Sequence, residues 1–440
     1  MAQPAQDIAV PPGEAWLTTS SPERRLGSFL ATLKAEAARS YDALGKRAGV
    51  STSALHRYCT GAGAPTEFDP LDRFARVCGA DRDTRRELYR LWVLADASRA
   101  RTRVAGLPDR GVPAQLPPGV TPFVGRGAAL AELDSLATRS PVVAVTGMPG
   151  SGKTALVVRW AHEARARFRD GQLYADLRGF APDPPVPVRD VLAGFLTALG
   201  ATDLPVSVDQ LVGRYRTELS GRRLLVVLDN VAAADDVRPL LPGPSCHTVV
   251  TSRDRLAGLV ARDGAQRLNL DVPPVDEAVD LLRCLVGGQV DADPVTAAAL
   301  VTRCGRSPLV LRLVAELVAA RPGVRLREVL DELTDPPRLL AALSAGGDPR
   351  AGLDAVLSWS YRRLGAGEAM TFRALGLHPG PDVGPHTAAA LTGSDPPAEL
   401  STLERLAGAS LLRATGPDRY ALPEPLWTYA RQLTDSASCQ

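Results

Sequence analysis

The feature that most constrains the fold is a glycine-rich segment, residues 147–154, which reads GMPGSGKT. It directly follows the apolar run 142–145 and directly precedes a stretch with helical character, residues 155–168. The segment fits the pattern G-x-x-x-x-G-K-S/T, in which a loop between a strand and a helix wraps its backbone N–H groups around phosphate oxygens. Glycine is needed there because the loop takes backbone angles and close approaches that a side chain would block. The segment therefore predicts a parallel α/β domain that binds ATP or ADP.

Three side chains are expected to complete this nucleotide site. Lys153 should reach the β- and γ-phosphates, and the Thr154 hydroxyl should bind Mg²⁺. Asp229 follows another apolar run and is the acid expected to hold the same ion, so Lys153 and Asp229 are predicted catalytic groups. Asn230 comes next, and because an amide cannot act as a base, we expect weak ATPase activity at most unless Asp254 or another acid substitutes. The residues of the loop expected to contact the nucleotide are Gly147, Gly150, Ser151, Gly152, Lys153, Thr154 and Ala155.

Composition indicates how many domains to expect and which compartment, metal and membrane partners fit this chain. With 440 residues the chain exceeds what one hydrophobic core usually supports, so roughly two to four domains are expected. The six cysteines are scattered, without a CxxC pair or a cysteine and histidine cluster at zinc spacing. This favours a reduced, cytoplasmic location without disulfides or a bound zinc. No window approaches the roughly 18 apolar residues that a membrane span needs, so no membrane partner is expected.

The spacing of apolar residues changes along the chain and predicts a multidomain protein. Helical spacing comes first, a segment rich in proline and glycine follows, and short apolar runs then alternate with helices. Helices dominate the last third, up to a predicted hairpin around a Gly-Pro-Asp turn, which is typical of a winged helix. We therefore expect a flexible tail at 1–20, an all-α helix-turn-helix domain at 21–105, a linker at 106–120, an α/β P-loop NTPase domain at 121–270, a helical lid at 271–345 and a C-terminal winged helix at 346–435.

The first of these domains carries a second functional signal. Residues 21–105 contain 16 Lys and Arg against 10 Asp and Glu, and a basic module favours a nucleic-acid partner. Two short helical stretches flank Gly49, and Ser51 can cap the second of them. This arrangement predicts a DNA-binding helix-turn-helix. The second helix is poor in Arg, Asn and Gln, so a helical domain used for self-association is the alternative. The candidate DNA-binding residues are Lys46, Arg47, Ser51, Thr52, Ser53, His56 and Arg57.

Five segments of the remaining chain occur in one order. They read TPFVGR at 121–126, GMPGSGKT at 147–154, LLVVLDN at 224–230, VVTSR at 249–253 and CGRSPL at 304–309. In order and spacing they resemble the NB-ARC core of signal-transduction (STAND) P-loop NTPases, over residues 121 to about 433. The N-terminal domain resembles the repressor-type helix-turn-helix domains that precede such cores in actinobacterial antibiotic-pathway regulators.

The resemblance implies further site residues. It places an adenine pocket around Val124, Gly125 and Arg126, with Pro308 of the lid packing near the adenine. It also makes Arg253 a sensor of the γ-phosphate and a third catalytic residue.

The chain departs from the family pattern at two places. Residues 127–129 read GAA, where an acidic residue usually follows the Gly-Arg pair. Residues 422–425 read LPEP, where the winged helix often carries a histidine that touches the ADP phosphate. No imidazole is available there, and Glu424 either holds an arginine of the lid or is a solvated turn residue.

Two classes of function agree with these features. In the first, the chain is an ATP/ADP-dependent switch: ADP favours a closed monomer, while ATP with Mg²⁺ favours an open form that assembles into homo-oligomers and regulates transcription by binding DNA. In the second, it is an NTPase that acts through protein partners, as a scaffold, defence ATPase or accessory factor, without sequence-specific DNA binding. The basic excess and the helix-turn-helix pattern favour the first class.

Overall fold

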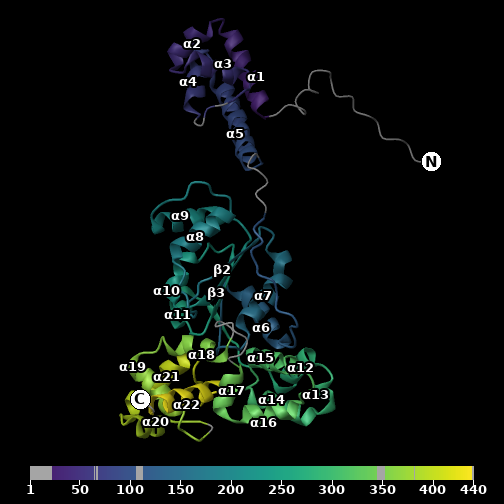
Figure 1. The fold of residues 1–440 in the computed structure, drawn as a ribbon. Helices are drawn as coiled ribbons and strands as arrows, with labels where there is room; N and C mark the ends of the chain where they lie inside the picture. The colour runs from purple at the N-terminus through teal and green to yellow at the C-terminus, as the bar shows by residue number, and fades with distance from the viewer. Residues whose placement is uncertain are drawn as a thin grey trace, which may run out of the picture. The chain divides into compact units, whose positions relative to one another are not determined.

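The computed structural model describes residues 22–63, 65, 68–105, 112–343, 352–380 and 382–438. The chain divides into two compact units, Met1–Gly111 and Val112–Gln440 (Figure 1). The predicted tail at 1–20 and residues 106–111 of the predicted linker lie outside the described residues. No helix in the described ranges is long and apolar enough to cross a bilayer.

Among its described residues, the first unit consists of five helices packed around one core, as predicted for an all-α domain. Leu44 of the second helix and Leu55 of the third are both buried in this core. The turn between them begins at Gly49, whose left-handed backbone (φ 66°) favours glycine. The helices are α1 (Pro22–Glu36), α2 (Tyr41–Ala48), α3 (Thr52–Cys59), α4 (Asp69–Val77) and α5 (Arg82–Ala105).

A parallel sheet forms the centre of the first part of the second unit. Over the described residues its order is β2-β3-β4-β1-β5, so the loop after the interior strand β1 opens at the carboxyl edge of the sheet. The sequence predicted the first four strands but not β5, which reads QRLN and buries only Leu268 well. The strands are β1 (Val142–Thr146), β2 (Gln172–Asp176), β3 (Leu225–Val231), β4 (His247–Ser252) and β5 (Gln266–Asn269).

Helices cover both faces of this sheet, because successive strand residues point to opposite sides. Val143 and Val145 of β1 pack in a core with helices on one face, whereas Val142 and Ala144 pack in the core of the other face. The first face is covered by α6 (Gly127–Arg139) and α7 (Lys153–Glu163), the second by α8 (Val188–Ala198), α9 (Val208–Leu219) and α11 (Ala257–Asp263). Short helical turns complete the domain: η1 (Ala164–Arg167), α10 (Ala234–Val237) and η2 (Arg238–Leu240).

The second half of the predicted linker is part of the sheet domain. Gln172 N–H donates to Pro113 O at 2.7 Å, and Gln115 N–H donates to Gln172 O at 3.1 Å, so this extended segment pairs with the edge strand β2. The expectation of a linker through residue 120 is therefore wrong for residues 112–120. Proline removes some backbone donors but leaves its carbonyl free to accept, as Pro113 does here.

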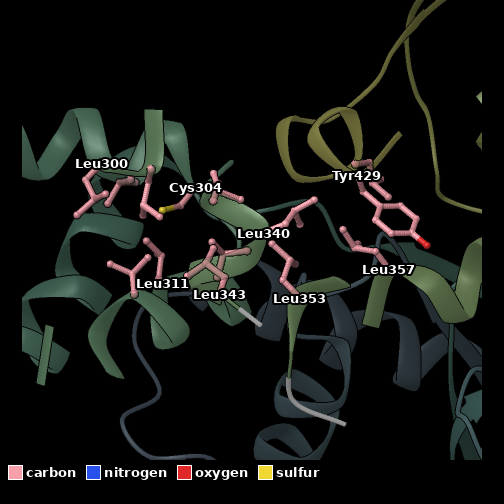
Figure 2. Close-up of a cluster of buried hydrophobic side chains, with 14 of the residues drawn as sticks. Leu300, Cys304, Leu311, Leu340, Leu343, Leu353, Leu357 and Tyr429 are labelled. Carbon is pink, nitrogen blue, oxygen red and sulfur yellow. The ribbon is translucent and has the colours of Figure 1, made fainter. Parts of the chain in front are cut away.

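The rest of the unit is helical, as predicted, and ends in a small hairpin and a last helix. Leu300, Leu340, Leu357 and Tyr429 belong to one hydrophobic core that runs from α12 to α22 (Figure 2). The predicted lid and winged helix therefore share a core instead of packing separately. The helices are α12 (Val275–Val286), α13 (Gln289–Ala292), α14 (Pro294–Arg303), α15 (Pro308–Ala319), α16 (Leu326–Thr334), α17 (Pro336–Leu343), α18 (Leu353–Tyr361), α19 (Ala366–Leu375), α20 (Pro385–Thr392), α21 (Pro396–Gly408) and α22 (Glu424–Ser438), and the hairpin consists of β6 (Arg413–Gly416) and β7 (Arg419–Ala421).

Candidate nucleotide site and candidate DNA-binding helix

The glycine-rich loop connects β1 to α7, as the sequence predicted. Gly147 (φ 152°) and Gly150 (φ 77°) both lie in the backbone region that favours glycine. A Cβ atom on Gly147 would lie 2.3 Å from Leu270 O, and one on Gly150 would lie 2.7 Å from Ser307 Oγ. The neighbouring chain therefore leaves no room for a side chain at either position, and the loop can wrap tightly around an anion.

Lys153 begins α7 and turns its ammonium group back onto the loop. Its Nζ donates to Gly147 O and to Met148 O, each at 2.9 Å. Burial and, to a smaller extent, the nearby charge of Arg253 lower the pKa of Lys153 to about 7, although Asp229 acts in the opposite direction. Phosphate oxygens would be stronger acceptors for this ammonium than the two carbonyls, because they carry charge.

Asp229 lies at the carboxyl end of β3, where three hydroxyl groups hold its carboxylate. Thr154 Oγ1 donates to Oδ1 at 2.8 Å, Tyr174 Oη donates to Oδ2 at 3.0 Å, and Thr251 Oγ1 also donates to Oδ1. Burial raises the pKa of Asp229, while these hydrogen bonds oppose the shift. The adjacent hydroxyl of Thr154 and carboxylate of Asp229 are hard oxygen donors that fit one Mg²⁺.

A cavity of about 740 Å³ opens over these groups. It brings together residues of the loop, β3, β4 and α15 that are far apart in sequence. Beside it, a second pocket is lined by Val124, Arg126 and Ala155, and Pro308 borders both. The predicted site residues that line the first cavity are Gly150, Gly152, Lys153, Thr154, Ala155, Asp229, Arg253 and Pro308.

Arg126 joins the predicted adenine pocket to the phosphate-binding loop. Its guanidinium donates to Ser151 O and to Asp271 O, each at 2.7 Å. Its backbone N–H donates to Glu277 Oε2 at 2.9 Å, and a Cβ on the preceding Gly125 would lie 2.5 Å from the same carboxylate. Glu277 of α12 therefore fixes the backbone at Gly125 and Arg126, where the resemblance implies an adenine pocket.

Arg253 lines the cavity, but its guanidinium is bound to the C-terminal part of the unit. Nη1 donates to Val356 O at 2.7 Å and to Ser360 Oγ at 2.8 Å, both on α18. The guanidinium also lies over the rings of Phe180, at 5.3 Å, and Trp359, at 5.7 Å. Burial lowers the pKa of Arg253 to about 10, far above neutrality, so the group keeps its charge. Its predicted contact with a γ-phosphate stays a prediction.

Asn230 and Asp254 each accept a backbone N–H, and of the two only Asn230, whose amide cannot act as a base, lines the cavity. Asn230 Oδ1 accepts from Phe180 N–H at 3.2 Å, and the residue takes left-handed backbone angles (φ 57°). Asp254 Oδ1 accepts from Leu256 N–H at 2.7 Å, and Asp254 is not among the residues that line the cavity. Asp176, at the end of β2, does line it, and the sequence analysis missed this acid because β2 belongs to none of the five motifs.

Glu424 binds an arginine of the lid, which decides between the two expectations for this residue. It forms an ion pair with Arg303 of α14. Arg303 also donates from Nε to Leu333 O at 2.8 Å and from Nη2 to Thr334 O at 3.0 Å. Where the family often carries a histidine, this chain therefore has a glutamate that links the lid to the last helix.

In the first unit, α3 is capped at its start, buried on one face and exposed on the other. Ser51 Oγ accepts from Ala54 N–H at 3.3 Å and caps the helix, as predicted. Leu55 and Cys59 point into the core. The candidate DNA-binding residues of the helix and its cap, Ser51, Thr52, Ser53, His56 and Arg57, are exposed. Lys46 and Arg47 are exposed at the end of α2, where Lys46 pairs with Asp42 at 3.0 Å.

Comparison with known proteins identifies a family for the first unit and relatives that match most of the chain. The family described as a helix-turn-helix domain matches residues 25–88. The regulatory protein AfsR of Streptomyces griseus is 40% identical over 332 residues, which cover 73% of this chain and 33% of AfsR. AfsR of Streptomyces coelicolor is 38% identical over 356 residues, 78% of this chain and 35% of AfsR. Among solved structures, a Walker-type ATPase of Pyrococcus abyssi is similar with a TM-score of 0.48 and 13% identity, over 72% of this chain and 98% of that one.

The chain is thus related to AfsR-type regulators and carries an N-terminal helix-turn-helix domain, as the resemblance predicted. It spans about a third of the length of the curated relatives it matches.

Proposed function

We propose that the chain is an ATP/ADP-dependent switch that regulates transcription by binding DNA. Three findings support this function: the phosphate-binding loop with its acid, the capped and exposed helix α3, and the similarity to regulatory proteins. When bound, ATP with Mg²⁺ would bring a negatively charged γ-phosphate into the site, which ADP lacks. Lys153 binds the phosphates, Thr154 and Asp229 hold the ion, and Val124, Arg126 and Pro308 surround the base.

The observation that carries the proposal is the position of Arg253. The same guanidinium lines the nucleotide cavity and holds α18 through Val356 O and Ser360 Oγ. A γ-phosphate is a charged acceptor, and it competes for this guanidinium better than a neutral carbonyl and a hydroxyl do. ATP therefore favours release of α18, whereas ADP, which lacks the γ-phosphate, leaves the contact intact.

Further polar contacts join the sheet domain to the C-terminal helices, among them the bond from Arg255 N–H to Gly408 O at 2.9 Å. Arg363 Nη1 donates to Gly179 O at 3.1 Å, and its guanidinium lies 5.1 Å from the Phe180 ring, on which Arg253 also rests. Because α12 to α22 share one core, we expect these helices to move together when the contacts to the sheet domain are lost. The opened form would then expose surfaces for homo-oligomers, which bring several recognition helices to one DNA site.

The test is selection of bound DNA from genomic fragments, with ATP and Mg²⁺, with ADP, and without nucleotide. We expect enrichment of a site with repeated or inverted halves, and more of it with ATP than with ADP. A chain that lacks residues 1–105 is the matched control and should enrich nothing. Equal binding in all three nucleotide conditions, or no enrichment above background, would exclude the proposed function.

In that case the alternative, an NTPase that works through protein partners, takes its place. One observation favours it: Tyr89, Val93 and Leu94 of α5 are 51%, 41% and 44% exposed, although apolar. Exposed apolar residues close together on one helix often mark a protein-binding surface.

A further inference from the structure

The nucleotide cavity contains an acid at the end of the strand beside Asp229. Asp176 is the last residue of β2, and the parallel pairing of β2 with β3 places it directly opposite Asp229. Tyr174, two residues earlier, lies on the same face of the strand and donates to Asp229. Asp176 therefore projects to the side of the sheet edge where Lys153, Thr154 and Asp229 line the cavity.

The turn after β2 holds Asp176 in place. Leu177 N–H donates to Asp229 O at 2.9 Å, and Gly179 N–H donates to Asn230 O at 2.7 Å. Together with the bond from Phe180 N–H to Asn230 Oδ1, these contacts fasten the turn to the end of β3. Asn230 thus uses its amide to position this turn, in the place where many ATPases carry a base.

The carboxylate of Asp176 keeps one oxygen available. Oδ1 accepts from Arg178 N–H at 2.8 Å. Within the described ranges no ion pair involves Asp176, and the side chain is exposed to the cavity. By contrast, the carboxylate of Asp229 receives three hydroxyl hydrogen bonds. Asp254 Oδ1 accepts a backbone N–H just as Asp176 does, but Asp254 is not among the residues that line the cavity. Asp176 is thus an acid fixed at the end of a strand, with an oxygen that can accept a proton from a water molecule, whereas Asp183, which also lines the cavity, lies in the loop that follows.

We propose that Asp176 is the proton acceptor for hydrolysis of ATP at this site, an inference that rests on the proposed nucleotide function. The water oxygen forms a bond to the γ-phosphorus, and the bond from that phosphorus to the β,γ-bridging oxygen breaks with its electron pair leaving on ADP. The proton lost by the water passes to the Asp176 carboxylate and then to solvent, so the products are ADP, inorganic phosphate and one proton. Lys153 and the Thr154 and Asp229 pair hold the phosphates and the ion through this step.

The experiment compares the full chain with Asp176→Asn, and with Asp190→Asn as a control that removes an exposed carboxylate in the first turn of α8. Single-turnover hydrolysis should fall at least about tenfold in Asp176→Asn, since a positioned base typically contributes on the order of a hundredfold or more. Affinity for ATP with Mg²⁺ should stay within about threefold of the wild type, because the amide removes a step of the reaction and not a phosphate contact. Asp190→Asn should match the wild type in both.

A second readout does not depend on turnover. ADP with aluminium fluoride mimics the hydrolytic transition state, so the wild type and Asp190→Asn should retain ADP more tightly when aluminium fluoride is present, and Asp176→Asn should not. Asp176→Glu keeps a carboxylate and should recover part of both signals, while thermal unfolding checks that each variant is folded.

A wild-type hydrolysis rate in Asp176→Asn, or equal losses of rate and ATP affinity, would overturn the assignment. If the wild type binds ATP but neither hydrolyses it nor retains ADP with aluminium fluoride, this inference fails and the switch function stands. If the wild type does not bind ATP, both fail.

Discussion

At the scale of single residues, Lys153 links α7 to the glycine-rich loop of the proposed nucleotide site. Its ammonium satisfies two carbonyls of its own loop, Gly147 O and Met148 O. These two bonds tie the start of α7 to the loop, and phosphate oxygens would compete with two neutral acceptors for the same ammonium. The same bonds help a segment with three left-handed glycines (Gly147, Gly150 and Gly152) to keep one conformation.

We expect Lys153→Ala to weaken ATP binding at least about tenfold, on the order of 1.4 kcal/mol, because a charge-assisted contact to the phosphates is lost. Titration calorimetry measures this directly. Lys34→Ala, which removes a lysine of the first unit, is the control and should bind ATP as the wild type does. Wild-type affinity in Lys153→Ala would contradict the assignment of the loop.

A second prediction concerns acid stability and His247, at the start of β4. Partial burial of the ring lowers the pKa of His247. The hydrogen bond between Nε2 and Ala137 O (2.9 Å) opposes this shift, and the charge of Arg167 reinforces it. The folded chain thus takes up this proton at lower pH than the unfolded chain, whose histidine titrates near 6.5. Stability is therefore lost as pH falls through that value.

His247→Gln should remove part of this loss. Between about pH 7 and about pH 5, the midpoint of urea unfolding should fall less in the variant than in the wild type. His386→Gln, at an exposed position of α20, serves as the control. An unchanged pH dependence in His247→Gln would show that this ring does not titrate on unfolding.

At the scale of elements, α3 is the helix with the most direct functional consequence. Its buried face, Leu55 and Cys59, is fixed by the core, so its exposed face has a defined direction. If this face enters a major groove, His56→Ala with Arg57→Ala should weaken binding to a selected site by roughly 1 to 3 kcal/mol per lost base contact. Affinity for ATP should not change, because the nucleotide site lies in the other unit.

Binding should also fall steeply with salt, since phosphate contacts by Lys46, Arg47 and Arg57 release counterions. Fluorescence anisotropy with a selected duplex, at several salt concentrations, measures both effects. Arg86→Ala on α5 removes a charge away from α3 and is the matched control. Equal losses in the control and in the α3 variant would mean that general charge, and not this helix, binds DNA.

A further prediction concerns α17, which joins the lid to the last helices. Leu340 is 1% exposed in the shared core (Figure 2). Leu340→Ala should lower the free energy of unfolding by about 2 to 5 kcal/mol, as large cavities in such cores do. Leu391→Ala, at a position 37% exposed, should cost far less in the same urea titration. Similar costs at both positions would contradict a continuous core.

Local sequence patterns predicted most of these elements, and the exceptions have physical reasons. Runs of Val and Leu predicted four strands because buried parallel strands are apolar on both faces. β5 escaped prediction because, at the edge of the sheet, it reads QRLN and buries only Leu268 well. Residues 112–120 escaped because pairing with Gln172 uses a proline carbonyl, which the proline-rich composition does not reveal.

The residues of the site divide in the same way, into those that a local motif predicts and those that only the tertiary structure reveals. Gly147 to Thr154 and Asp229 follow motifs whose spacing encodes their contacts. Asp176 and the bonds from Arg253 to α18 depend on which strands and helices become neighbours. That pairing is set by the whole fold, so one sequence without its tertiary structure does not predict it.

At the scale of the whole molecule, the proposal requires that nucleotide change the balance between a closed and an open form. A ligand shifts such a balance only by its difference in affinity for the two forms. In the proposed switch Arg253 would supply this difference, because it is bound to Val356 O and Ser360 Oγ in this structure and would be free to bind a γ-phosphate in the open form.

Two variants separate these roles of Arg253. Ser360→Ala removes one acceptor of the closed form and leaves the guanidinium able to bind ATP. Ser360 is buried and the change removes only a hydroxyl, so the helix should keep its packing. We therefore expect higher DNA affinity in the presence of ADP than the wild type shows, and a partly assembled population by light scattering, because the closed form has lost a hydrogen bond of about 1 kcal/mol.

Arg253→Ala removes both the contact with α18 and the predicted contact with the γ-phosphate. The variant should still bind ADP through Lys153, but its DNA affinity and molecular mass should be the same with ATP as with ADP, because nothing distinguishes the two nucleotides at this position. DNA affinity and mass are measured on the same samples, with ATP and Mg²⁺ and with ADP. An Arg253→Ala chain that still responds to ATP, together with a Ser360→Ala chain that behaves as the wild type does with ADP, would show that the nucleotide acts on the domains by another route.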